Sequence, residues 1–512
     1  MGLLVVWACI VTVYVTTHSF PSGKGGFYFV MARELVANGF VYPVHLDSYI
    51  VQRIPYAFPP IGIYLYAIGL ELGVSVPTLG MAVPALFLGG IGIAVVVFVV
   101  EFTDDFRAAW FAGVLAITHP LVLRQHLVAT GSARNAGLIG AFLTVALARR
   151  TMRTDRRRLA VIAGLAWGVT ILSHPVFTYL AALGVLVVYE RERADGEGLV
   201  TGVTVAAVGL AVGAPWLGHV LLNHGPLTLF EAGISYHEGP LLNWDGFVDV
   251  LLNMLPHLSQ FYTVAALFGV TVLVRRRSWG MIGWFTIVGL PYPHSGGLSA
   301  IAATVGGVGW ATVATRVDNA VASLRGTDGS DLWPQVSVGV GSVVVALVVA
   351  TAAIGFGGSY AAANVGLHDI PEFVSDDDVR ALEALAAEPD APVAAPRRVQ
   401  TWVPVIAGSP TLATSKGTEW VSGDGRTGTV VSDKFSSVGS CTTADCYVAN
   451  ATGDIGTFDV YLNDDPTAAA EFADAPRFTV IYDQDGIVIA RFDPSGAGQR
   501  DRLSSDRSPV VV

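Results

Sequence analysis

Charged side chains, lysine and cysteine are all scarce in this chain. Only 14% of its 512 residues are charged, 52% are hydrophobic, and the mean hydropathy is +0.55. An average soluble domain carries about 25% charged residues, so this composition indicates a polytopic membrane protein. Lysine occurs three times against 41 acidic residues, and the net charge is −11. Because carboxylate-rich surfaces stay solvated at high salt, we predict a halophilic archaeal source, and we predict no nucleic-acid partner.

The chain has three cysteines, and only two of them stand close together. Cys9 lies in an apolar segment and is expected to be inert. Cys441 and Cys446 enclose the sequence C-T-T-A-D-C, which offers too few ligands for zinc. We predict that these two form a small disulfide, which requires an oxidising, external compartment. Asn450 opens an N-glycosylation sequon, Asn-Ala-Thr, that has meaning only in the same compartment.

Long apolar runs fill the first 357 residues. A spanning helix needs about 20 apolar residues, and hydropathy predicts roughly eleven spans, the first of them retained rather than cleaved. The predicted spans are 3–16, 77–100, 108–125, 136–148, 159–173, 176–190, 199–221, 260–274, 279–293, 297–315 and 336–357. The sequence Ser173-His174-Pro175 predicts a turn between two of them, because proline disfavours helix at the preceding residue.

Arginine clusters predict the orientation of the spans. The largest cluster runs from Arg149 to Arg158, and another is Arg275–Arg277. Loops rich in arginine stay in the cytoplasm. Counting spans outward from these clusters places 23–76, 222–259 and the chain beyond Tyr360 on the external side.

The predicted external loop 23–76 is unusually long and rich in aromatic residues. Loops of this length inside compact proteins are usually functional or disordered, and the aromatic content argues against disorder. Within it, Ala32–Asn38 is predicted to form a surface helix. The count of spans also requires that Pro59–Gly73 forms a helix in the outer leaflet without crossing the membrane.

The predicted fold class is an all-α polytopic membrane domain followed by a small external α+β domain. The predicted parts are the membrane domain 1–358, the external loop 23–76 with juxtamembrane helices within it, the soluble external domain 359–500 and the disordered tail 501–512. In the soluble domain, residues 369–388 are predicted as a helix. Residues 477–491 are predicted as a β-hairpin that turns at Asp483–Gly486.

The predicted external side collects polar groups at membrane depth, where such groups are costly and therefore candidates for function. We predict that Arg53, Arg124 and Arg134 converge on one phosphate or pyrophosphate, because guanidinium binds phosphate bidentately. No nucleotide-binding glycine loop, metal-ligand cluster or Ser-His-Asp arrangement is evident, so we predict neither cofactor nor metal. For histidines beside proline, such as His174 and His294, the alternative is a helix-end cap. For the aromatic run the alternative is an interfacial belt.

Two pieces of the 23–76 loop carry a family resemblance. The sequence A-R-E-L-V-A-N-G-F-x-x-P, then Tyr49, then I-P-Y-A-F-P-P-I-G-I-Y-L resembles the first external loop of GT-C integral-membrane glycosyltransferases. It is similar to the protein mannosyltransferases and the lipid A aminoarabinose transferase, and the resemblance covers most of residues 1–357. It implies sugar transfer from a polyprenyl-phosphate donor in the cell membrane to a glycan, lipid or protein acceptor on the external face of the cell envelope.

The motif and the polar clustering together predict the residues that bind the donor or its carrier. They are Tyr28, Arg33, Tyr49, Arg53, Tyr56, Pro59, Pro60, Arg124, His126, Arg134, His174 and His294.

The chain departs from the family at the expected general base. The family has an Asp just before a Phe-Tyr pair, where this chain has Gly23-Lys24-Gly25-Gly26, and a second acid after the third span, where it has Ala129–Ser132. A base must reach the acceptor proton, so Asp47 in the loop is the predicted catalytic residue. The other external carboxylates that we consider are Glu231, Glu238 and Asp245.

Two classes of function are therefore open. One is a glycosyltransferase for hexosyl or pentosyl transfer, in which the arginines stabilise the leaving phosphate. The other is a non-catalytic protein of the same fold, a sugar-lipid binder, scaffold or transporter, which the missing acids favour. A transporter would show interrupted helices in two related halves, and the sequence shows no such repeat.

Overall fold

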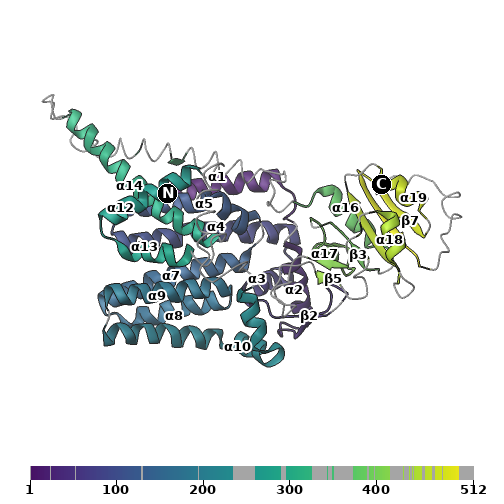
Figure 1. Cartoon of the computed structure of the whole chain (residues 1–512), viewed down its shortest axis with the longest axis horizontal. Helices are drawn as coiled ribbons and strands as arrows, with labels where there is room; N and C mark the ends of the chain where they lie inside the picture. The colour runs from purple at the N-terminus through teal and green to yellow at the C-terminus, as the bar shows by residue number, and fades with distance from the viewer. Residues whose placement is uncertain are drawn as a thin grey trace. The chain divides into compact units, whose positions relative to one another are not determined.

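The computed structural model of the chain divides into two compact units, whose elements are labelled in Figure 1. Unit 1 comprises Met1–Pro21 and Phe58–Ile370, and unit 2 comprises Ser22–Ala57 and Pro371–Val512. The structure describes residues 2–22, 25–51, 53–128, 131–193, 195–234, 260–289, 296–325, 343, 349–350, 373–388, 391–396, 398–414, 430–431, 438, 441, 443–451, 456–463, 467–475 and 477–494. The predicted tail 501–512 lies outside these residues.

In its described residues, unit 1 consists of helices joined by short turns. They are α1 (Gly2–Thr17), α3 (Pro60–Glu71), α4 (Val76–Thr103), α5 (Phe106–Thr118), α6 (Pro120–Val122), the π-helix η1 (Leu123–Val128), α7 (Ser132–Thr154), α8 (Arg157–Ile171), α9 (Pro175–Glu192), α10 (Gly196–Ile234), α12 (Gln260–Arg275), α13 (Trp279–Gly289) and α14 (Gly296–Arg325).

The long helices of unit 1 pack side by side as a bundle (Figure 1). Helix α7 contacts α4, α8 and α9, and α5 packs against α4 and α14. A Cβ on Gly307 would lie 2.3 Å from the backbone nitrogen of Ala112, and one on Gly269 would lie 1.9 Å from the carbonyl oxygen of Val305. These helix contacts therefore require glycine, and small residues at helix interfaces are typical of membrane bundles.

Several helices of unit 1 are candidate membrane spans. By length and composition, three of the described helices could cross a membrane, and a bent pair is a fourth if it forms one span. They are α4, residues Gly196–Leu229 of α10, residues Ala300–Ala320 of α14, and the pair Phe106–Thr118 with Pro120–Val128. The chain is thus a membrane protein, whereas the count of eleven spans stays a prediction. The predicted span 336–357 lies almost entirely outside the described residues.

The helix over the predicted span 108–125 is bent. The helices on either side of His119 are bent by 54° relative to each other. Pro120 lacks a backbone N–H and drives the residue before it towards an extended conformation, and His119 has φ −64° and ψ 126°. The Leu121 N–H donates to Nδ1 of His119 at 3.2 Å. This imidazole therefore caps the helix that follows the bend.

Two other predictions for unit 1 are confirmed. Helix α8 ends at Ile171 and α9 begins at Pro175, so the Ser173-His174-Pro175 turn is where the sequence places it. The second half of the predicted loop contains the helix α3, which starts with Pro60 at its first position. Proline is favoured there because its missing N–H would have no partner in the first turn anyway. The depth of α3 in the membrane stays a prediction.

Unit 2 contains both helices and strands. Its elements are α2 (Gly25–Ala37), β1 (His45–Leu46), β2 (Ile54–Pro55), α16 (Asp376–Leu385), β3 (Val393–Ala394), α17 (Val403–Ile406), β4 (Ala413–Thr414), β5 (Val430–Val431), α18 (Ala444–Asn450), β6 (Phe458–Asn463), α19 (Ala468–Asp474), β7 (Phe478–Gln484) and β8 (Ile487–Phe492). Four strands form a sheet in the order β3-β6-β8-β7, in which β3 and β6 are parallel and the other pairs are antiparallel.

Local sequence signals explain two elements of unit 2. The hairpin β7–β8 turns at Asp485-Gly486, whose φ angles are 55° and 77°, as a type I′ turn requires. Helix α16 starts at Asp376, later than the predicted 369, because Ser375 and Asp378 form a reciprocal capping box there. A capping box satisfies two backbone N–H groups at a helix start.

The structure contains the predicted disulfide between Cys441 and Cys446, whose Cα atoms are 5.4 Å apart. The side-chain nitrogen of Asn450 donates to the Cys446 carbonyl oxygen at 2.9 Å. This nitrogen is the atom that would carry a glycan, and after glycosylation it would keep one N–H. Glycosylation at this residue stays a prediction.

The first part of the predicted 23–76 loop belongs to unit 2 and not to the membrane helices. Helix α2 lies against α17 (Figure 1). The indole nitrogen of the fully buried Trp402 donates to the Ser22 carbonyl oxygen at 3.0 Å, and its ring centroid lies 5.7 Å from that of Phe29. The Arg33 guanidinium donates to the Val405 carbonyl oxygen.

A second contact holds the end of the same segment. The Thr411 N–H donates to the Tyr49 carbonyl oxygen at 3.1 Å, and Ile50 forms a parallel bridge with Thr411. By contacts, Ser22–Ala57 groups with Pro371–Val512, while the chain from Phe58 onwards groups with the helices; the division into the domains 1–358 and 359–500 stays a prediction. The reason for this grouping is burial: the aromatic and backbone groups of the segment are covered by residues that lie more than 350 positions away.

Helix α2 also starts earlier than predicted, at Gly25 and not at Ala32. A Cβ on Gly26 would lie 2.1 Å from the Thr401 carbonyl oxygen, a separation that real Cβ atoms do not adopt. Glycine at this position is therefore what allows the first turn of α2 to approach the 401–402 backbone.

Replacing Gly26 by alanine is expected to destabilise unit 2. In a helix, alanine normally stabilises by about 0.5–1 kcal/mol relative to glycine. Overpacking against backbone costs about 1–3 kcal/mol, so Gly26→Ala should lower the thermal unfolding temperature of the full chain in detergent. The matched control is Gly218→Ala in α10, where a Cβ would meet nothing within 4 Å. A Gly26→Ala protein as stable as this control would contradict the close approach.

Candidate functional site

Unit 1 contains a group of buried polar side chains at the start of α7. We call His126, Ser132, Asn135 and His174 the η1 cluster. His126 lies in η1, Ser132 and Asn135 lie in the first turn of α7, and His174 precedes α9. Their exposed fractions are 0% for the first three and 6% for His174. A buried polar group is costly unless it is hydrogen-bonded, so these side chains are candidates for a functional site.

His126 and Asn135 hold each other in a fixed orientation. Nδ1 of His126 lies 2.6 Å from Oδ1 of Asn135, and Nδ2 of Asn135 donates to the His126 carbonyl oxygen at 2.7 Å. Because the amide oxygen can only accept, Nδ1 of His126 carries the proton of this bond. In the neutral ring Nε2 then presents a lone pair, and this atom is buried with no hydrogen-bond partner among the described residues.

The Ser132 hydroxyl is the second buried polar group of the cluster that lacks a hydrogen-bond partner in the described part of the chain. It faces α3: a Cβ on Gly62 would lie 2.7 Å from Ser132 Oγ. The Ile61 N–H donates to the Leu172 carbonyl oxygen at 3.1 Å, which fixes the start of α3 beside the turn before α9. An unsatisfied buried hydroxyl costs about 1–3 kcal/mol, so its retention calls for a ligand or a function.

Phe177 connects the two histidines of the cluster. Its ring centroid lies 5.2 Å from that of His174 and 6.3 Å from that of His126. A Cβ on Gly137 would lie 3.0 Å from the Cβ of His174. The start of α9 is therefore packed closely on α7, and His174 is held beside the cluster.

The π-helix η1 places His126 in this arrangement. It spans Leu123–Val128, between the proline-induced bend and the start of α7. A π-helix has i→i+5 hydrogen bonds, is rare, and is frequently found at functional sites. The sequence predicted His126 as a binding residue, but it contains no signal for the π-helix itself, nor for the buried hydroxyl of Ser132.

The arginines of the predicted phosphate clamp fall in different units. Arg134 donates to Oε1 of Gln125 at 3.4 Å, and it neighbours Asn135 in α7. Arg124 is half-buried in η1. Arg53 belongs to unit 2, so convergence of all three arginines stays a prediction.

Asp47, the predicted base, lies at the surface of unit 2. Its Oδ1 is 3.0 Å from Nε of Arg53, and both side chains are more than half exposed. Its backbone N–H donates to Oε1 of Glu34 at 3.0 Å. Burial raises the pKa of the Glu34 carboxyl, and the nearby Asp47 charge also raises it. The hydrogen bonds from the Asp47 N–H and the Ser48 side chain act in the opposite direction and lower this pKa. Asp47, Arg53 and Glu34 thus form a compact charged group beside β1 and β2.

The aromatic candidates of unit 2 lie in its core. Tyr49 is fully buried, and the buried Tyr56 hydroxyl donates to the Met31 carbonyl oxygen at 2.6 Å. Tyr28 is 5% exposed. Arg33 is committed to Val405, and burial lowers the pKa of its guanidinium. These contacts are structural, so a role of these residues in binding the donor stays a prediction.

The remaining candidates are placed as follows. Pro59 and Pro60 initiate α3, and Glu231 lies in α10. His294, Glu238 and Asp245 lie outside the described residues. Among the described residues no group of three or more His, Cys, Asp and Glu side chains is placed to hold a metal ion.

Comparison with known proteins rests on structure, because no protein-family model and no curated protein matches the sequence. The chain is similar to the archaeal oligosaccharyltransferase AglB from Archaeoglobus fulgidus, in complex with an inhibitory peptide and a dolichol-phosphate. That match has 14% identity, a TM-score of 0.58 and 80% coverage of this chain, which spans 63% of the length of AglB.

Two further similar structures are ArnT from Cupriavidus metallidurans bound to undecaprenyl phosphate and the arabinofuranosyltransferase AftD from Mycobacteria. ArnT matches with 16% identity and a TM-score of 0.57, over 97% of this chain and 98% of that one. AftD matches with 13% identity and a TM-score of 0.53, over 96% of this chain and 40% of that one. At such identities the likeness shows the fold alone, and the chain has the GT-C fold of integral-membrane glycosyltransferases, as its first loop predicts.

Proposed function

We propose that the protein is a membrane glycosyltransferase that transfers a hexosyl or pentosyl group from a polyprenyl-phosphate donor. The acceptor is a glycan, a lipid or a protein on the external face of the cell membrane. The observation that carries this proposal is the likeness to ArnT bound to undecaprenyl phosphate, which extends over 97% of this chain and 98% of that one. The dolichol-phosphate in the similar AglB structure supports the same class of carrier.

The η1 cluster is proposed to bind the polar head of the donor. The Ser132 hydroxyl supplies a hydrogen-bond donor, and Nε2 of His126 supplies an acceptor for a sugar hydroxyl. Both atoms are buried and lack partners in the described chain, so a bound head group would satisfy them. Arg124 and Arg134 flank the cluster and would stabilise the phosphate as the bond to the sugar breaks, because charge-assisted bonds to phosphate are the strong ones.

Transfer also needs a group that accepts the proton of the acceptor hydroxyl. The hydroxyl oxygen bonds to the anomeric carbon, the phosphate leaves with the electron pair of the broken bond, and the proton passes to a carboxylate. Asp47 is the proposed carboxylate, and its exposed oxygen beside Arg53 is accessible to an acceptor from solvent. The polyprenyl phosphate remains in the bilayer for reuse.

The alternative is a non-catalytic protein of the same fold that binds a sugar lipid. The close approach at Gly26 favours this alternative, because the backbone there leaves no space even for a Cβ. A carboxylate therefore cannot occupy this position just before the Phe-Tyr pair, where similar transferases carry one. Donor binding without transfer would decide for the alternative.

The arginine clusters predict that the β7–β8 hairpin lies outside the cell. A cysteine at the exposed Gln484 should react with a membrane-impermeant maleimide in intact cells, and a cysteine at Arg153 should not. The unsubstituted chain gives the background from Cys9, since Cys441 and Cys446 are paired. Labelling at residue 153 alone would reverse the proposed orientation.

Asp47→Asn should reduce sugar transfer by about 10²–10⁴-fold, the usual contribution of a general base. Transfer is measured in membranes with equal amounts of protein. The matched control is Asp483→Asn, which removes an exposed carboxylate of the same unit far from β1 and β2 in sequence. Undiminished transfer by the Asp47 variant would exclude this residue as the base.

Ser132→Ala separates a binding role from a structural one. The substitution removes a buried hydroxyl without a partner, so the thermal unfolding temperature should stay constant or rise. The affinity for undecaprenyl phosphate should fall roughly tenfold, since a bond to a charged group is worth about 1.5–3 kcal/mol. The control is Thr144→Val in the same helix. The Thr144 hydroxyl donates to the Gly140 carbonyl oxygen at 2.7 Å, so this substitution should leave the affinity unchanged. Lower stability with unchanged affinity would make Ser132 structural.

A further inference from the structure

A second polar site lies at the other end of the helices that carry the η1 cluster. In helix α7, Arg149 lies seventeen residues after Ser132. On α9, Arg191 lies seventeen residues after His174, which precedes that helix. At about 1.5 Å per residue the two ends are roughly 26 Å apart, close to the roughly 30 Å of a bilayer core. Arg149 at this far end belongs to the cluster Arg149–Arg158, which is predicted to be cytoplasmic.

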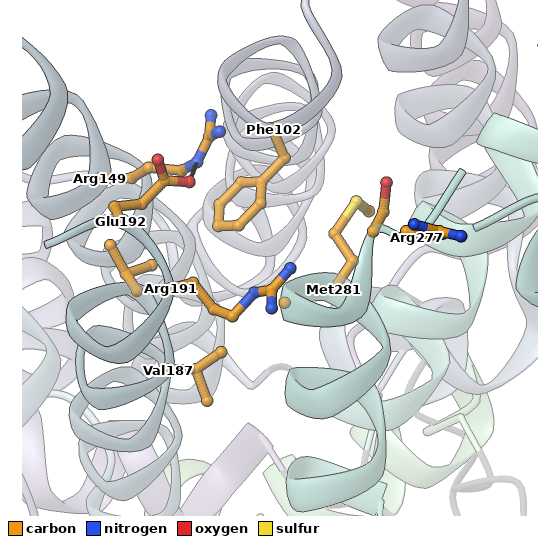
Figure 2. A pocket seen from close by; sticks show the side chains of 10 residues that line it. Phe102, Arg149, Val187, Arg191, Glu192, Arg277 and Met281 are labelled. Carbon is orange, nitrogen blue, oxygen red and sulfur yellow. Dashed lines mark hydrogen bonds and ion pairs between the residues drawn. The ribbon is translucent and has the colours of Figure 1, made fainter. Parts of the chain in front are cut away.

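These ends form a pocket of about 220 Å³ together with α4 and the start of α13. Figure 2 shows the arginines Arg149, Arg191 and Arg277 around it, with Glu192 and Phe102. Three guanidinium groups and one carboxylate therefore line the pocket, which leaves two positive charges without a lining counter-charge. A pocket below the usual ligand range of about 300–1,000 Å³ suits a small anionic group and not a whole cofactor.

Arg149 is held in place and still has an unused donor. Its Nε lies 2.7 Å from Oε1 of Glu192, and its side chain is 11% exposed. Its guanidinium stacks over Phe102, with the central carbon 4.6 Å from the ring centroid. Its NH1 is buried and has no hydrogen-bond partner among the described residues. A buried guanidinium nitrogen without a partner is costly, and this sets Arg149 apart from the other lining arginines.

Neighbouring arginines outside the pocket lie beside carboxylates. Arg193 pairs with the carboxylates of Asp155, Asp195 and Glu197, and Arg153 lies 3.8 Å from Asp104. In the described part of the chain, neither Arg191 nor Arg277 forms such a pair. Within the pocket, Arg149 is mostly buried, lies over Phe102 and is paired with Glu192. Arg191 and Arg277 are exposed and line the pocket without a carboxylate partner among the described residues.

The start of α13 adds further donors. Ser278 directly precedes this helix, and both Ser278 and Gly280 line the pocket. A Cβ on Gly280 would lie 3.7 Å from Cγ of Arg191, so the Arg191 stem lies along the first turn of α13. Helix starts present free N–H groups and positive potential to phosphate.

We propose that this pocket binds a phosphate group on the side of the membrane opposite the η1 cluster. The phosphate comes either from an anionic lipid headgroup or from a soluble phosphate compound. Arg149 and Arg277 bind it through guanidinium N–H bonds, and Glu192 keeps Arg149 in position. The inference does not depend on sugar transfer, because it concerns a separate site about one membrane thickness away.

The test measures binding to the full chain with two separate probes. One is inorganic phosphate added to protein in neutral detergent. The other is a nanodisc of phosphatidylcholine with or without phosphatidylglycerol. The thermal unfolding temperature should rise with at least one probe, because a ligand that binds only the folded state stabilises it. A rise with phosphate alone indicates a soluble ligand, and a rise with phosphatidylglycerol alone indicates a lipid headgroup.

Arg277→Gln should weaken this binding about tenfold or more. Arg277 is exposed and forms no described ion pair, so the variant should fold. Arg149→Gln should act in the same direction but leaves Glu192 without its partner. The matched control is Arg156→Gln, which removes an exposed arginine of the same cluster outside the pocket. No rise with either probe, or equal binding by the Arg277 and Arg156 variants, would overturn the proposal.

Discussion

The bond between the Trp402 indole and the Ser22 carbonyl oxygen determines where the first loop belongs. It joins residues 380 positions apart, and loop closure over such a distance is costly in entropy. The burial of Trp402, the stacking of Phe29 on it and the bond of Arg33 to Val405 offset that cost together. The first part of the segment that resembles a transferase loop, Ser22–Ala57, is thus built as a part of unit 2, and its shape depends on these distant contacts.

This constraint also explains why the loop lacks the expected acid. Helix α2 starts at Gly25-Gly26 because the Thr401 carbonyl oxygen occupies the space of a Cβ at Gly26. A sequence with Asp at that position would have to separate α2 from the 401–402 backbone. The absence of a carboxylate at this position therefore goes together with the close packing of α2 on the 401–402 backbone. Any proton acceptor must come from elsewhere, and Asp47 is the carboxylate that the same segment still exposes.

Local patterns in the sequence predict the helices well and the site only in part. Apolar runs and prolines mark α4, α9 and the start of α3, because hydropathy and the missing proline N–H act locally. The bend at His119 was missed because the run 108–125 stays apolar across Pro120. The membership of Ser22–Ala57 in unit 2 depends on contacts with distant residues, and the missing partners of Ser132 and His126 are properties of the packed bundle. No local pattern in the sequence encodes the contacts of Ser22–Ala57 or the missing hydrogen-bond partners.

Helices α7 and α9 connect the two polar ends of unit 1 as one rigid pair. A Cβ on Gly184 would lie 2.4 Å from Cγ2 of Val145, and one on Gly137 would lie 3.0 Å from the Cβ of His174 at the other end, so neither helix can slide along the other without a clash. Two unit charges roughly 26 Å apart interact by only about 0.6 kcal/mol at an effective dielectric constant of about 20. An anion at Arg149 therefore hardly reaches the η1 cluster through its electric field, and any coupling between the two ends would have to pass through the packing of this helix pair.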